Sequence, residues 1–122
     1  MQNLFVYGSL RRGMQNEFAR LLHERSDFVG TAQVRGTLYD LGAYAGLVVS
    51  ATAQCWVSGE VFAIKDDDLM LKLDEYEGSE FERVVVDATL GSGVVTPCWV
   101  YSYRGNVAGR REITSGEVPR GG

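Results

Sequence analysis

The sequence is poor in the residues on which several common kinds of site depend. Among its 122 residues there is one histidine, His23, and there are two cysteines, Cys55 and Cys98. A four-ligand zinc site would therefore need carboxylate help, and we expect no metal. Each cysteine falls in a segment that is typical of a strand, so buried free thiols fit best, although the sequence leaves a disulfide open.

Long hydrophobic runs and an excess of basic residues are also missing. No segment approaches the roughly 20 apolar residues of a membrane-spanning helix, and residues 1–7 lack the basic flank and apolar stretch of a signal peptide. The net charge of −4 argues against binding polyanions by electrostatics alone. We therefore expect a cytoplasmic protein with neither nucleic acid nor a membrane as partner. The sequence does not indicate the oligomeric state.

What is present suits one compact domain. The hydrophobic content is 45%, and the 15 glycines are spread along the chain rather than gathered in a linker. We expect residues 1–122 to form a single domain in which 117–122 are a flexible tail.

The apolar spacing predicts two short helices and six or seven strands. One helix is expected at 16–24, and the other at 66–77, where Asp66 or Asp67 can cap the start and Gly78 can end it. Strands are expected at 3–7, 28–34, 36–41, 47–50, 54–64, 81–90 and 94–103. This number of strands favours an α+β fold with a curled or closed sheet.

The first segment that could carry chemistry is Val6–Gly13, VYGSLRRG, between a strand and a helix. Gly8 has no side chain to block close approach, so successive backbone N–H groups there could bind a carboxylate or a polarised carbonyl oxygen. An ordinary turn is the alternative. The loop lacks a P-loop ending and a G-x-S-x-G motif, and Ser9 has no evident base to make it a nucleophile.

The second such segment is Leu73–Gly78, LDEYEG, which places three carboxylates at the end of the second helix. Most acidic runs are solvated helix faces. Glu77, however, stands where the helix's unpaired carbonyls disfavour a negative charge, and Asp74 on the same side would add repulsion if both were partly buried. A carboxyl with such a raised pKa suits a general base.

Together the two segments resemble the γ-glutamylcyclotransferase-like, or AIG2-like, proteins, and the small bacterial members most closely. The resemblance extends to residues 36–42, 57–61 and 81–83. It implies a small, mixed, closed or nearly closed β-barrel with two short flanking helices and a cavity at one end. It also implies that Tyr7, Gly8, Ser9 and Leu10 bind the substrate, and that the glutamate immediately before glycine, Glu77 rather than Glu75, is catalytic.

The reaction implied by this resemblance needs no cofactor. The α-amine of a γ-glutamyl amine, dipeptide or related isopeptide attacks its own side-chain carbonyl and releases 5-oxoproline, with Glu77 as general acid/base. Arg83 is expected to pair with a substrate carboxylate, with a structural salt bridge as the alternative.

A second hypothesis is a non-catalytic module that binds a carboxylate-bearing small metabolite or a peptide end. Its motivation is that the chain departs from the family pattern. Phe81 stands where members often place tyrosine, and the segment that ends in Glu117 and Val118 lacks the aromatic residue that is common at its end.

Overall fold

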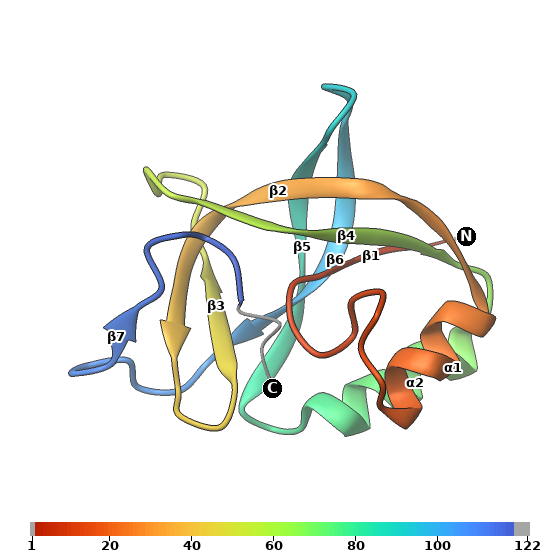
Figure 1. The fold of residues 1–122 in the computed structure, drawn as a ribbon, viewed down its shortest axis with the longest axis horizontal. Helices are drawn as coiled ribbons and strands as arrows, with labels where there is room; N and C mark the ends of the chain where they lie inside the picture. Colours follow the sequence, from red (N-terminus) through yellow and green to blue (C-terminus); the bar gives the residue numbers. More distant parts are fainter. Residues whose placement is uncertain (1, 119–122) are drawn as a thin grey trace.

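The computed structural model describes residues 2–118, and the named elements lie in this range (Figure 1). The elements are β1 (Gln2–Val6), α1 (Glu17–Glu24), β2 (Ser26–Asp40), β3 (Ala45–Val49), β4 (Trp56–Ile64), α2 (Asp67–Glu77), β5 (Phe81–Leu90), β6 (Val95–Tyr103) and β7 (Arg111–Glu112). The two predicted helices and most predicted strands are confirmed. The short strand β7 has no counterpart in the sequence prediction.

Five of the strands close into a mixed barrel. β1 pairs with β4, β4 with β2, and β2 with β3, all antiparallel, while β6 closes the ring by parallel pairing with both β3 and β1. β5 forms an antiparallel hairpin with β6 that projects from the barrel at the top of Figure 1. The predicted α+β fold with a closed sheet is therefore confirmed.

The long strand β2 corrects one sequence prediction. Segments 28–34 and 36–41, expected as two strands, form one continuous strand that pairs first with β4 and then with β3. A bulge between Phe28 and Gly30 shifts the register. The alternation of buried and exposed side chains is lost at that point, so Ala32 and Val34 are buried whereas Phe28 is exposed.

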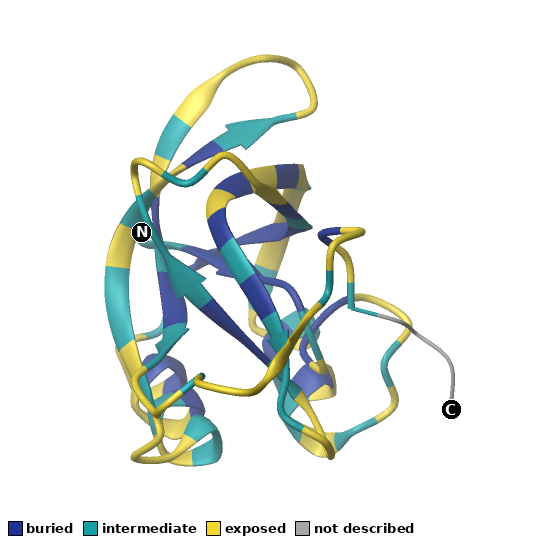
Figure 2. Ribbon diagram, turned by 90° about the vertical axis from the view of Figure 1, so that its left-hand side faces the viewer, coloured by how far each residue is buried: buried dark blue, intermediate teal, exposed yellow. Residues whose placement is uncertain are grey.

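Two hydrophobic cores meet at β1. Leu4 and Val6 face the two helices, whereas Phe5 and Tyr7 face the barrel interior. Successive strand side chains point to opposite faces, so both faces of β1 are covered from Leu4 onward. Residues 4–6 belong to the buried residues drawn in dark blue in Figure 2, whereas Gln2 and Asn3 are only partly buried. The end of β1 is therefore firmly held where the loop after it begins.

Both helices begin and end at the residues that the sequence indicates. The Asn16 side chain accepts a hydrogen bond from the Ala19 N–H and caps α1, and the Asp66 side chain caps α2 at Asp68. Gly78 ends α2 in a left-handed conformation with φ of 81°, which side-chain-bearing residues rarely adopt. Glu77 is thus the last residue of α2.

The cysteines differ from the expectation in one respect. Both are free; Cys98 is buried in β6, but Cys55 is exposed because it precedes β4 in an irregular segment at the surface. Within residues 2–118, no group of three or more His, Cys, Asp or Glu side chains is arranged to hold a metal ion. None of the helices in this range is long and apolar enough to cross a membrane.

Candidate functional site

A cavity of about 430 Å³ lies between the loop after β1, the end of α2 and the turn between β2 and β3. Its size falls in the range of small-molecule sites. The predicted loop residues and Glu77, almost 70 positions apart in the chain, line this one cavity. The lining residues are Phe5, Val6, Tyr7, Gly8, Ser9, Leu10, Met14, Ala43, Tyr44, Ala45, Tyr76, Glu77, Glu80, Phe81, Tyr101 and Val118.

Glu77 enters the cavity from the end of α2. Its side chain is partly buried, and burial raises the pKa of its carboxyl from 4.5 to about 7. The repulsion by Asp74 that the spacing suggested is not the cause, since the Asp74 carboxylate is bound by Arg83. Near neutral pH, Glu77 can therefore both accept and donate a proton.

The loop that lines the cavity together with Glu77 is held in place through its carbonyl groups. The carbonyl of Gly8 accepts a hydrogen bond from Arg11 Nε at 3.0 Å, and that of Ser9 accepts one from Asn16 Nδ2 at 2.7 Å. The carbonyl of Leu10 lies 2.9 Å from His23 Nε2 and accepts its N–H when that nitrogen is protonated. In the described part of the chain, no acceptor binds the N–H groups of Gly8, Ser9 or Leu10.

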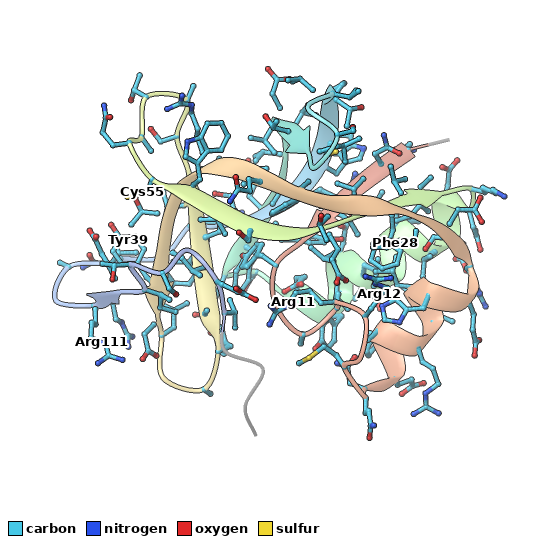
Figure 3. All side chains as sticks on the ribbon, turned by 45° about the horizontal axis from the view of Figure 1, so that its top comes forward. Arg11, Arg12, Phe28, Tyr39, Cys55 and Arg111 are labelled. Atoms are coloured by element: carbon cyan, nitrogen blue, oxygen red, sulfur yellow. The ribbon has the colours of Figure 1, made fainter. Side chains whose placement is uncertain are left out.

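Two arginines after the loop fix it to the rest of the molecule (Figure 3). The backbone N–H of Arg12 donates to the buried Glu60 carboxylate at 2.6 Å, and the Arg12 guanidinium lies 3.6 Å above the Phe28 ring. The buried side chain of Arg11 also donates to the Val118 carbonyl at 2.9 Å, which holds that residue at the cavity wall. Of the predicted tail 117–122, the structure describes only residues 117 and 118; residues 119–122 lie outside the described range.

Gly8 and Tyr7 contribute in different ways. A Cβ atom at Gly8 would meet no heavy atom within 4 Å, so the glycine leaves open space beside the cavity. The Tyr7 hydroxyl donates to the Tyr101 carbonyl at 2.7 Å and accepts the Leu47 N–H at 3.1 Å. Burial, with a smaller contribution from the nearby Glu77 charge, raises the pKa of Tyr7, so this hydroxyl stays neutral.

Arg83 is placed outside the cavity lining. Its guanidinium donates to both oxygens of Asp74, at 2.8 and 3.1 Å, and lies 4.3 Å from the centre of the Trp99 ring. The Tyr101 hydroxyl donates to the same Asp74 carboxylate at 2.8 Å. This placement corresponds to the salt-bridge alternative and gives no support to the predicted contact between Arg83 and a substrate.

The remaining wall was not anticipated from the sequence. Tyr44, from the turn between β2 and β3, donates its hydroxyl to Glu80 Oε1 at 2.6 Å, and the Phe81 ring lies 6.0 Å from that of Tyr44. Arg11, Asn16 and His23, which hold the loop carbonyls, were missed as well. The only signal for these three residues was their position just after the glycine loop and in the first helix. A side chain that binds a backbone carbonyl produces no recognisable sequence motif.

Comparison with known proteins places the chain in a family. The sequence profile described as "Gamma-glutamyl cyclotransferase, AIG2-like" matches residues 4–118. A Vibrio cholerae protein that is named provisionally as a gamma-glutamylcyclotransferase is 36% identical over 109 residues, which cover 85% of this chain and 84% of that protein. A Niallia circulans protein named gamma-L-glutamyl-butirosin B gamma-glutamyl cyclotransferase is 31% identical, over 84% of this chain and 67% of its own.

A solved structure agrees with these sequence relatives. The crystal structure of an AIG2-like protein from Mus musculus superposes with a TM-score of 0.73 at 25% identity, covering 85% of this chain and 78% of that one. Because the profile spans nearly the whole chain and a relative is 36% identical over most of both proteins, this chain belongs to the gamma-glutamyl cyclotransferase, AIG2-like family.

Proposed function

We propose that the protein is a cofactor-independent cyclotransferase that converts a γ-glutamyl amine or peptide into 5-oxoproline and the free amine. A bond forms between the α-nitrogen and the side-chain carbonyl carbon of the substrate, and the bond from that carbon to the departing nitrogen breaks. Two protons leave the α-ammonium and two reach the departing nitrogen, so the reaction needs neither oxidant nor water. Such an intramolecular reaction depends on positioning and proton transfer.

The proposal is supported above all by the shared cavity that Glu77 lines together with the loop whose N–H groups bind no acceptor in the described part of the chain. A carboxyl whose pKa is about 7 can take a proton from the α-ammonium and return it to the departing nitrogen without a large energetic penalty in either direction. The N–H groups of Gly8, Ser9 and Leu10 are suited to bind substrate oxygens, including the charge that develops on the attacked carbonyl. We expect the reaction to take place in the cytoplasm.

The deciding experiment is turnover of a panel of γ-glutamyl amines, dipeptides and isopeptides, with 5-oxoproline detected by mass spectrometry. We expect wild-type protein treated with a chelator to remain active. Glu77→Gln should lose a factor of about 10²–10⁴ in kcat, as is common when a general acid/base is removed. Glu75→Gln is the matched control, because Glu75 is exposed on the same helix and does not line the cavity.

Folded wild-type protein that is inactive across this panel would refute the enzymatic proposal. If the inactive wild-type protein and the Glu77→Gln variant bound the compounds equally well, the chain would instead be a binding module for a small carboxylate-bearing molecule. Equal loss of activity in Glu75→Gln and Glu77→Gln would remove Glu77 from its proposed role.

A further inference from the structure

We propose that the amine released by this protein carries a second positive charge at its far end, which the cavity wall formed by Tyr44, Glu80 and Phe81 recognises. This inference rests on the proposed function and specifies its substrate class. It concerns the group attached to the γ-glutamyl nitrogen, whereas the loop and Glu77 concern the glutamyl part.

The charges around the cavity are of one sign. Glu77 and Glu80 are the only carboxylic acids among the described lining residues, and none of these residues is Lys, Arg or His. The substrate's α-ammonium is matched by Glu77, and its α-carboxylate can be bound by backbone N–H groups of the loop. With both charges of the glutamyl part matched in this way, no positive charge of that part remains to pair with the Glu80 carboxylate.

Within residues 2–118, Glu80 is also without a cationic partner. No Lys or Arg nitrogen in the described residues lies within 4.0 Å of its carboxylate. The Tyr44 hydroxyl occupies Oε1 at 2.6 Å and thereby orients the carboxylate, while Oε2 receives no hydrogen bond in the described part of the chain. Two arginines influence this part of the wall without pairing with the carboxylate. Arg110 opposes the rise in the Tyr44 pKa, and the backbone N–H of Arg104 donates to the Glu80 carbonyl.

The aromatic neighbours of Glu80 favour the same kind of ligand. The Phe81 ring lies 6.0 Å from Tyr44 and 5.5 Å from Tyr103, which packs against it edge-on. An ammonium group near such ring faces and a carboxylate is stabilised by both. A second carboxylate on the substrate would instead be repelled by Glu80.

The path of the departing group leads to this wall. Glu77 must reach both the α-nitrogen and the departing nitrogen, so the group attached to the latter starts beside Glu77. In the proposed reaction, the N–H groups of the loop are occupied by the glutamyl oxygens. The departing group therefore extends along the cavity wall that follows α2, where Glu80 and Phe81 lie three and four residues beyond Glu77.

The test uses three γ-glutamyl amides that differ only at the far end: those of 1,4-diaminobutane, pentylamine and 5-aminopentanoate, which end in an ammonium, a methyl and a carboxylate. We expect kcat/KM to be about five- to tenfold higher for the ammonium than for the methyl compound, the range typical of a partly exposed charge contact reinforced by aromatic rings. The carboxylate compound should be the poorest substrate. In the Glu80→Gln variant, the ratio of kcat/KM for the ammonium compound to kcat/KM for the methyl compound should fall close to one.

Glu82→Gln is the matched control, because it makes the same charge change two residues away on an exposed side chain that does not line the cavity. It should keep the preference of the wild type. Equal kcat/KM for the three amides, or a preference that survives Glu80→Gln, would overturn the inference while leaving the proposed reaction intact.

Binding to the Glu77→Gln protein, measured by calorimetry, separates this inference from the proposed function. If wild type turned over none of the amides, the proposed reaction would fail. The dissociation constants of the three amides would then still test whether the wall recognises the ammonium end. Tightest binding of the ammonium compound would support this recognition, and equal binding of all three would contradict it.

Discussion

Replacing Glu77 by glutamine should stabilise the protein at alkaline pH while greatly slowing the proposed reaction. Burial raises the pKa of this carboxyl from 4.5 to about 7, so the folded protein holds the proton more tightly than the unfolded chain. The resulting stability is fully present below pH 4.5 and is lost as the pH rises through about 7. Glutamine keeps the shape of the neutral acid and cannot ionise.

The magnitude follows from the size of the shift. Two to three pKa units at about 1.4 kcal/mol each correspond to a penalty of about 3 kcal/mol once the carboxyl is fully ionised. For a chain of this length that is about 10 °C in Tm. Wild type and Glu77→Gln should therefore unfold almost together near pH 4, and the variant should become the more stable protein by up to these amounts at pH 8.5.

The assay is thermal and urea unfolding at pH 4, 5.5, 7 and 8.5. Only the difference between variant and wild type is compared, so that groups titrating elsewhere cancel. Glu75→Gln, on the exposed side of α2, should show a difference that hardly changes with pH. A difference for Glu77→Gln that is equally flat, or that turns unfavourable at high pH, would refute the reasoning that burial of Glu77 is costly.

Three further predictions concern the surroundings of Glu77. For the proposed reaction, kcat/KM should rise with pH through about 7, because Glu77 must be ionised to accept a proton; a flat profile between pH 6 and 8 would contradict this. Asn16→Asp keeps the oxygen that caps α1 but loses the donor to the Ser9 carbonyl, so kcat should fall at least several-fold with little change in Tm, whereas an unchanged kcat would argue against loop positioning. Arg83→Met should cost about 1 kcal/mol of stability, as expected for a partly exposed ion pair, with little effect on KM; a large rise in KM at unchanged stability would restore the substrate contact predicted from the sequence.

Local patterns were sufficient to predict most of the fold. Apolar spacing located both helices, and Asp66 and Gly78 marked the limits of the second, since these residues act on their own neighbours in the chain. Strand composition located the sheet. The pattern could not show that residues 26–40 form one strand, because continuity there depends on pairing with β4 and β3, which are distant in sequence.

The candidate site was predictable where a motif exists and not elsewhere. The glycine loop and the acid before Gly78 were identified from their types and order, and they do line one cavity. Tyr44 and Glu80 were missed because their relation is a hydrogen bond across 36 positions between two turns. The interpretation of Asp74 as a repulsive neighbour was wrong, because only the three-dimensional structure shows that Arg83 and Tyr101 both bind it.

Because α2 ends at Gly78, the length of this helix sets the direction in which the Glu77 carboxyl points. Every helical residue adds about 100° of rotation and 1.5 Å of rise. Leu69 and Leu73, packed in the core, fix how α2 is turned about its axis. Deleting Glu75, which does not line the cavity, would turn the Glu77 carboxyl by about 100° away from the cavity while every lining side chain remained in the sequence. The number of residues between the core leucines and Gly78 therefore matters as much for the site as the presence of the glutamate itself.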